Sequence, residues 1–131
     1  MASDLILIIE DNEKNRKLIR DVLQVKGYRT QETETAEEGH KLAVENHPSL
    51  ILMDIQLPGM DGITALKQLR ADPITKTIRV IAITASAMSY NRQAMLAEGF
   101  DGYQNKPISV KEFLEEVNRV LDSDQDKASV S

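Results

Sequence analysis

The chain has 131 residues, no cysteine, a formal net charge of -5 at pH 7 and a pI near 5.0. This length is typical of one domain, the lack of cysteine excludes disulfides and thiolate metal sites, and the acidic balance disfavours direct nucleic-acid binding, which needs clustered lysines and arginines. No apolar run approaches the ~20 residues that would cross a bilayer, and no signal peptide precedes the chain's first apolar run, so we expect a cytoplasmic protein without membrane insertion.

The first apolar segment, residues 5–9, is entirely aliphatic, which is typical of a strand buried on both faces of a sheet. The acidic pair Glu10 and Asp11 follows it directly. Between residues 15 and 26, apolar side chains recur at steps of three and four, which predicts an amphipathic helix, and Gly27 is suited to end it. The chain is therefore expected to begin with a strand, an acidic loop and a helix.

The next segment, residues 28–33, is largely polar and predicts an edge strand. Thr35 and Glu38 form the capping-box pattern that begins a second helix. His40 and His47 lie within this helix or just past it, with no neighbour suited to share a ligand. We therefore interpret both histidines as solvated side chains.

Residues 50–53 form another wholly apolar run, which ends at a single carboxylate, Asp54. The following residues, 57–62, include a proline and two glycines, which predicts a tight loop beside Asp54. A third helix is predicted over residues 63–71, because apolar residues recur there and a proline follows soon after. Asp54 is thus expected at the end of a central strand.

Residues 80–83 predict a fourth strand, which ends at Thr84. A helix is predicted over residues 87–98, with only a weak apolar stripe, so that much of it faces solvent or a partner. Residues 100–105 predict a short fifth strand that ends at Lys106. Both strands thus end at a polar side chain.

The last helix is predicted to begin at a second capping box, Ser109 with Glu112, and to run to about residue 121. Residues 122–131 are polar, and we expect a disordered tail there. The expected organisation is one domain over residues 1–121, followed by this tail.

Strands and helices alternate five times, which predicts a doubly wound α/β fold, a three-layer sandwich with a five-stranded parallel sheet between helices. Apolar runs belong in the middle and polar runs at the edges, which favours the strand order 2-1-3-4-5. The carboxyl ends of parallel strands share one rim. The groups that should meet there are Glu10, Asp11, Asp54, Thr84 and Lys106.

Three carboxylates on one rim repel one another unless a cation joins them. Mg²⁺ suits this place, because it takes oxygen ligands and keeps waters and phosphate oxygens rather than a complete protein cage. The predicted magnesium ligands are Glu10, Asp11, Asp54 and the backbone carbonyl of Gln56.

Asp54 is the predicted nucleophile for a phosphoryl group, since carboxylates form acyl phosphates and such transfers depend mostly on positioning and charge neutralisation. Lys106 is expected to neutralise one phosphoryl oxygen, and the Thr84 hydroxyl to bond another. Taken singly, each residue also has a structural explanation, such as an acidic residue that begins a turn. The function is indicated by the coincidence of these groups on one rim.

Several motifs closely resemble those of receiver domains of two-component response regulators, the CheY-like superfamily with a flavodoxin-like fold, over about residues 5–121. They are Glu10-Asp11-Asn12, residues 52–62 around Asp54, Ile83-Thr84-Ala85 and Lys106-Pro107. The stretches most similar to single-domain receivers of the cell-division type are residues 50–58, 83–88 and 106–110. The chain ends without an output domain, so we expect a stand-alone receiver.

The resemblance implies that a sensor histidine kinase or a histidine phosphotransfer protein delivers the phosphoryl group to Asp54. It implies that Tyr103 matches the aromatic switch position and that the Lys106–Pro107 bond is cis. Phosphorylation is then expected to draw the Thr84 hydroxyl inward and to let Tyr103 move from an exposed to a buried position. We expect a downstream protein to bind the face made by the fourth helix, fifth strand and fifth helix.

Three other functions stay open at this point. A magnesium-dependent phosphatase of the haloacid dehalogenase type would need a second acid two residues after Asp54, where Gln56 stands. A flavodoxin would need glycine, serine and threonine amides after the first strand, where the loop from Glu10 to Glu13 is mostly acidic. A receiver could also serve only as a phosphorylation-independent scaffold, which the intact rim residues disfavour.

Overall fold

The sheet consists of five parallel strands in the order β2-β1-β3-β4-β5. The computed structural model describes residues 4–86 and 88–130, the last eight of them by backbone alone. The strands are β1 (Leu5–Ile9), β2 (Arg29–Thr33), β3 (Leu50–Asp54), β4 (Arg79–Thr84) and β5 (Gly102–Asn105). The predicted order is confirmed: the three apolar runs lie inside the sheet and the two polar runs at its edges.

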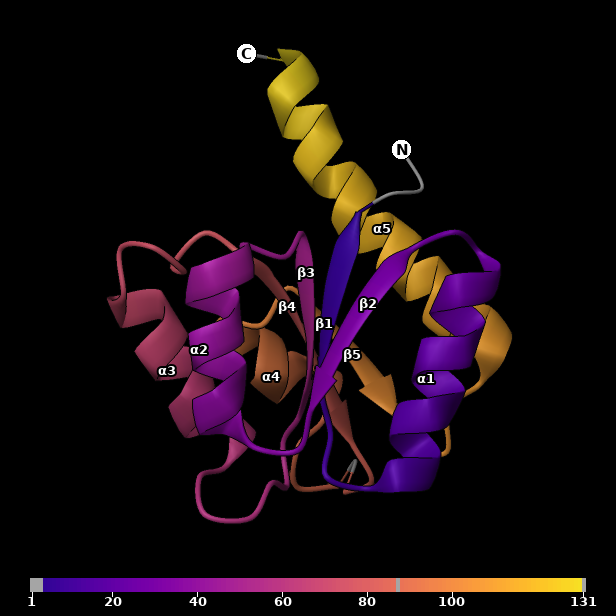
Figure 1. Ribbon diagram of the computed structural model, residues 1–131, viewed down its shortest axis with the longest axis vertical. Helices are drawn as coiled ribbons and strands as arrows, with labels where there is room; N and C mark the ends of the chain where they lie inside the picture. Colours follow the sequence, from indigo (N-terminus) through magenta and orange to yellow (C-terminus); the bar gives the residue numbers. More distant parts are fainter. Residues whose placement is uncertain (1–3, 87, 131) are drawn as a thin grey trace.

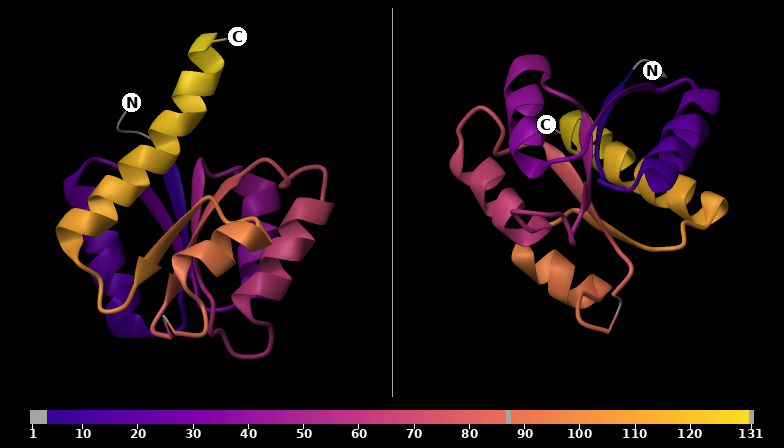
Figure 2. Two further views of the ribbon diagram at one scale, coloured as in Figure 1. Left: turned by 180° about the vertical axis from the view of Figure 1, so that it is seen from behind. Right: turned by 60° about the horizontal axis from the view of Figure 1, so that its bottom comes forward.

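Five helices follow the strands in turn and cover both faces of the sheet. They are α1 (Glu13–Val25), α2 (Ala36–Asn46), α3 (Gly62–Ala71), α4 (Arg92–Glu98) and α5 (Val110–Val130). α1 and α5 lie on one face, and α2, α3 and α4 on the other (Figures 1 and 2). This is the predicted doubly wound α/β sandwich. None of the described helices combines the length and apolar character that a bilayer span requires.

Alternation along the strands divides the core into two halves. On β1, Ile6 and Ile8 belong to the half beneath α1 and α5, whereas Leu7 and Ile9 belong to the half beneath α2, α3 and α4. β3 and β4 alternate in the same way. Every residue of β3 is buried, so the strand that carries Asp54 is held by packing on both faces.

Four helices begin at a side chain that accepts a hydrogen bond from a backbone N–H three residues further on. These caps are Asn12, Thr35, Asp61 and Asn91. The predicted cap at Thr35 is confirmed. The cap of α1 follows the acidic pair directly, so it fixes the end of the acidic loop.

α4 is shorter than the sequence predicts. It begins at Arg92, not at residue 87, because the side chain of Asn91 caps the helix and the preceding residues form a turn in which Tyr90 N–H bonds to the carbonyl of Ser86. Met88, which the apolar pattern assigned to the helix, is 98% exposed in this turn. Residue 87 lies outside the described part of the chain.

α5 is longer than predicted and extends past the end of the sheet to Val130 (Figure 1). Its predicted end near residue 121 is wrong, because no glycine or proline stands in residues 122–130 to stop the helix. The side chains of residues 123–131 lie outside the described part of the chain. The division into a domain over residues 1–121 and a disordered tail over residues 122–131 stays a prediction.

The interpretation of both histidines as solvated is wrong for His40. Its Nε2 lies 2.9 Å from Oδ2 of Asp72, the residue after α3, and this contact joins α2 to α3. The two residues are 32 positions apart, so no local pattern indicates the pair. His47 is exposed and ends α2 with a left-handed backbone, φ 47°.

Candidate functional site

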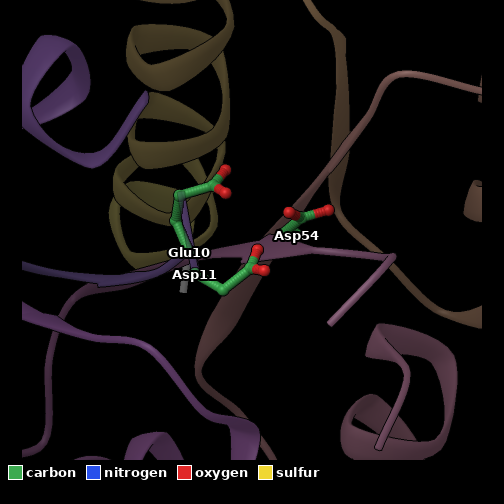
Figure 3. A group of neighbouring side chains, drawn as sticks. All are labelled: Glu10, Asp11 and Asp54. Atoms are coloured by element: carbon green, nitrogen blue, oxygen red, sulfur yellow. The ribbon is translucent and has the colours of Figure 1, made fainter. Parts of the chain in front are cut away.

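The carboxyl ends of the strands bring the predicted groups together. Asp54 ends β3 and Thr84 ends β4, while Glu10 and Lys106 directly follow β1 and β5. One carboxylate oxygen each from Glu10, Asp11 and Asp54 lies within 4.8 Å of the others. Figure 3 shows these three side chains directed toward a common space from two neighbouring strands.

Lys106 joins two of the acids. Its Nζ lies 2.9 Å from Oδ2 of Asp54 and 2.9 Å from Oε1 of Glu10. Burial acts to lower the pKa of Lys106, but its contacts with Glu10 and Asp54 outweigh burial and raise that pKa. Lys106 therefore carries its charge at neutral pH. The bond from Lys106 to Pro107 is cis, as the resemblance implies.

Glu10 is the less satisfied of the two buried acids of the cluster. Its Oε2 accepts the Asn12 N–H at 3.0 Å, whereas Oε1 is buried without a hydrogen bond to any described residue and meets Lys106 as an ion pair only. Burial acts to raise the pKa of Glu10, whereas Lys106 and the Asn12 N–H act to lower it. Burial is the larger effect, and the pKa rises to about 7. A buried charge in this condition is costly, so a further cation would stabilise it.

Asp54 is held in one orientation. Its Oδ1 accepts the backbone N–H of Gln56 at 2.9 Å, and Oδ2 accepts from Lys106. The start of α3 packs closely behind it, because a Cβ at Gly62 would lie 2.8 Å from the Asp54 carbonyl oxygen and 2.8 Å from Cα of Ile55. The backbone of Gln56 thus lies beside the acid cluster, and the role of its carbonyl as a metal ligand stays a prediction.

Thr84 is fully buried at the end of β4. Its Oγ1 accepts the N–H of Ser86 at 3.0 Å, and its carbonyl accepts the N–H of Lys106 at 2.8 Å. The hydroxyl can still donate one hydrogen bond. Thr84 is therefore tied to the loop after β4 and to the residue that follows β5.

Tyr103 does not occupy the exposed position that was expected. It is 5% exposed, its hydroxyl donates to Oδ1 of Asn105, and the guanidinium carbon of Arg92 lies 5.8 Å from its ring centre. The cation covers the ring and favours the inward position. The expectation of an exposed ring is wrong for this structure, and the role of Tyr103 as a switch stays a prediction.

Sequence reasoning missed two arginines near these groups. Arg16 donates to the backbone carbonyl of Glu10 at 2.9 Å, and Arg92 donates to the carboxylate of Glu116 at 3.1 Å. Both side chains occupy polar positions of amphipathic helices, where an arginine has no distinguishing pattern. Only the tertiary structure shows their partners.

The cluster fits a hard divalent cation. Its three side chains offer carboxylate oxygens alone, which Mg²⁺ and Ca²⁺ prefer, and one buried oxygen of Glu10 lacks a hydrogen bond. Within the described residues, no other group of three acidic or histidine side chains meets the same test. The predicted acids are thus brought together in a place that a cation could complete.

A doubly wound five-stranded sheet with an acid cluster and a lysine on its carboxyl rim is the arrangement that the resemblance to receiver domains predicts. Residues 6–118 match the family of the response regulator receiver domain. The chain therefore belongs to the response regulator receiver family and functions in two-component phosphorelay signalling. The predicted family and fold are confirmed, and the flavodoxin and phosphatase alternatives are not favoured.

Among its relatives is the polar-differentiation response regulator DivK. The chain is 44% identical over 116 residues to DivK of Brucella ovis and 43% identical to DivK of Brucella anthropi, with 88% of this chain and 94% of the relative covered in each case. It is similar to the receiver domain of the sensor histidine kinase PA1611 of Pseudomonas aeruginosa, solved with a magnesium ion in its active site cleft (TM-score 0.83, 30% identity, 91% of this chain and 98% of that one). The receiver domain of Francisella response regulator 1452 has TM-score 0.83 at 27% identity, over 92% of this chain and 98% of the other.

Proposed function

We propose that this receiver accepts a phosphoryl group on Asp54 in a reaction that needs Mg²⁺. The observation that carries the proposal is the contact between Lys106 and Asp54, 2.9 Å from Nζ to Oδ2, beside the carboxylates of Glu10 and Asp11. An acceptor, a cation for the incoming oxygens and an acid pair for a metal thus occupy one largely buried place. Phosphoryl transfer depends mainly on such positioning and charge neutralisation.

The donor in this proposal is a phosphohistidine of a sensor histidine kinase or of a histidine phosphotransfer protein. An oxygen of Asp54 forms the new P–O bond, the P–N bond of the donor breaks, and the imidazole leaves. Lys106 neutralises one phosphoryl oxygen and the Thr84 hydroxyl donates to another. Bound Mg²⁺, held by Glu10, Asp11, Asp54 and the carbonyl of Gln56, would offset the negative charge of acceptor and phosphoryl group.

The magnesium ion in the active site cleft of the PA1611 receiver supports the choice of metal. In this proposal the chain is a phosphoacceptor that catalyses only its own phosphorylation and dephosphorylation, and it works in the cytoplasm. The net charge of -5 supports a function without direct contact with nucleic acid.

The output surface in this proposal is the face formed by α4, β5 and α5. A pocket of about 380 Å³ opens on this face, lined by Asn91, Arg92, Tyr103, Gln104, Asn105, Pro107 and Glu112. Leu96 and Val110 add exposed apolar surface on α4 and α5. A downstream protein that binds here would sense the position of Tyr103, which lies in the pocket wall.

The acceptor can be tested with purified protein, Mg²⁺ and acetyl phosphate, and then with a panel of histidine kinases and labelled ATP. One base-labile phosphoryl group should appear on Asp54, and Asp54→Asn should abolish it. Asp21→Asn, which alters a half-exposed aspartate on α1, serves as the matched control and should be phosphorylated like the wild type. A modification mapped to another residue, or an unchanged stoichiometry in Asp54→Asn, would refute the assignment.

The scaffold alternative predicts a different result. If the protein only assembles partners, Asp54→Asn should bind them as tightly as the phosphorylated wild type does. Binding measured with both proteins at equal concentration separates the two functions.

A further inference from the structure

Arg16 reaches from the first turns of α1 back to the acidic loop. Its Nη1 donates to the carbonyl oxygen of Glu10 at 2.9 Å, and its Nε donates to Oε1 of Glu32 on β2 at 3.1 Å. The Arg16 side chain is 14% exposed. A largely buried guanidinium therefore connects the end of β1 to the neighbouring strand.

The Glu10 carbonyl belongs to the peptide that joins Glu10 to Asp11. Because a peptide group is planar, a bond to this oxygen also orients the backbone nitrogen and Cα of Asp11, from which its side chain starts. On the other side, the N–H of Asn12 bonds to Oε2 of Glu10, and the Asn12 side chain caps α1. Asp11 is exposed, and no described residue bonds its carboxylate, so its direction depends on the backbone.

We infer that Arg16 is a positioning residue for the metal site and that Glu32 orients it. By holding the peptide between Glu10 and Asp11, Arg16 directs both carboxylates at the same ion. The inference rests on the proposed magnesium site at this rim. Removing partners that orient metal ligands typically weakens metal binding by about 10- to 100-fold.

The charge of Arg16 affects Mg²⁺ affinity in the opposite direction to its positioning role. A guanidinium close to the site repels a divalent cation, so the loss of its charge alone should strengthen Mg²⁺ binding. The loss of its bond to the Glu10 carbonyl should weaken Mg²⁺ binding. Electrostatics and positioning therefore predict changes of opposite sign for one substitution.

Arg20 offers a matched control on the next turn of α1. Its Nη1 lies 3.1 Å from Oε2 of Glu32, and none of its bonds in the described structure involves Glu10. Arg20→Met thus removes the same charge and a contact with the same carboxylate, while the bond to the Glu10 carbonyl stays in place.

The experiment is a calorimetric titration of Mg²⁺ into metal-free wild type, Arg16→Met, Arg16→Lys and Arg20→Met, well below their melting temperatures, with folding checked by circular dichroism. Arg16→Met should bind about tenfold more weakly than the wild type, and Arg16→Lys, which keeps the charge but not the forked geometry, should also bind more weakly. Arg20→Met should bind as tightly as the wild type or slightly more tightly. The Asp11 amide resonance of the metal-free protein should shift in both Arg16 variants and not in Arg20→Met.

Arg16→Met or Arg16→Lys that binds Mg²⁺ as tightly as the wild type would overturn the role of Arg16 and leave the proposed site intact. A purely structural role would lower the melting temperature of both Arg16 variants without changing their affinity, and it would overturn the inference as well. A wild type that binds no Mg²⁺ would refute the metal site itself. Since Arg16→Lys keeps charge and length, it provides the measurement if Arg16→Met fails to fold.

Discussion

Two buried glutamates, Glu10 on the rim and Glu116 on α5, show one side chain in two different environments. They are 1% and 6% exposed. Burial alone would raise the pKa of Glu116, but bonds from Arg119, the Tyr103 backbone N–H and Arg92 outweigh it and lower that pKa. Burial prevails at Glu10, where one lysine is shared with Asp54, and raises the pKa to about 7.

The opposite pKa shifts distinguish Glu116, a structural group, from Glu10, a functional one. At Glu116 the fold supplies all the donors that a buried carboxylate needs, so the charge connects α4, β5 and α5 at little cost. At Glu10 the neutralisation is incomplete, so a cation from solution can contribute most there. A buried acid whose pKa is raised by burial is for this reason a better indicator of a site than burial itself.

The largest expected effect is on metal affinity. Glu10→Gln should weaken Mg²⁺ binding by roughly 100-fold. Loss of a residue that only orients a metal ligand costs about 10- to 100-fold, and loss of a proposed ligand should cost no less than the upper end of that range. Glu116→Gln should leave Mg²⁺ binding unchanged and lower the free energy of unfolding by about 1 to 3 kcal/mol, because two arginines lose a charged acceptor. Calorimetry with Mg²⁺ and urea unfolding measure the two effects. Equal losses of Mg²⁺ affinity in both variants would contradict the comparison.

The second effect concerns pH. The folded pKa of Glu10 lies above its ordinary value of 4.5, so its contribution to stability is fully present below pH 4.5 and is lost as the pH rises through about 7. The loss in metal-free wild type should be on the order of 3 kcal/mol. Glu116, with a lowered pKa, acts oppositely, and its contribution is lost as the pH falls below its ordinary value.

Urea unfolding across this pH range in a chelating buffer checks the prediction, with Glu10→Gln as the control that removes one titrating group. The free energy of unfolding should fall more steeply with rising pH in the wild type than in Glu10→Gln. Saturating Mg²⁺ should reduce the difference, since it stabilises the ionised carboxylate. Parallel curves for the two proteins would show that Glu10 does not titrate in this range.

The third effect is on signal transmission from the acid cluster to the surroundings of Glu116, through Thr84 and Tyr103. Thr84→Ala should still accept a phosphoryl group on Asp54, but its gain in partner affinity on phosphorylation should be smaller than in the wild type. For the wild type we expect a coupling of ~1 to 3 kcal/mol, or roughly 5- to 150-fold in affinity. Amide resonances between residues 85 and 103 should shift less on phosphorylation than in the wild type. If Thr84→Ala responds as fully as the wild type, the Thr84 hydroxyl does not transmit the signal.

The smallest effect is on the stability of the acid loop. Asp11→Ala should lose most Mg²⁺ affinity yet keep its metal-free free energy of unfolding, or gain up to about 1 kcal/mol, because a like charge leaves the cluster. The cap of α1 is the Asn12 side chain, so the helix start is preserved. A metal-free Asp11→Ala protein that melts well below the wild type would show that Asp11 has a structural role.

Much of this architecture follows from local sequence patterns. The contrast between the apolar run at residues 50–53 and the polar run at 28–33 predicted which strands lie inside the sheet. The shared rim of parallel strands then predicted that Glu10, Asp54 and Lys106 meet.

What could not be predicted depends on side chains that find partners across the fold. The pair of His40 with Asp72 joins two helices, and the bonds of Arg16 and Arg92 cross from a helix to a strand or to another helix. None of these contacts leaves a periodic trace in the sequence. The apolar spacing predicts a start of α4 that is too early, because the capping side chain of Asn91 and not the apolar pattern determines where the helix begins.

The close approach of Gly62 to β3 has a consequence for mutational scanning. Gly62 contributes no side chain to the acid cluster, yet even one methyl group there would collide with the Asp54 carbonyl oxygen and with Cα of Ile55. Those atoms are backbone and cannot rotate aside, so a substitution would displace the strand end that carries the acceptor. In a screen that scores phosphorylation, position 62 should therefore tolerate as few amino acids as the acceptor itself, although the effect is steric rather than chemical.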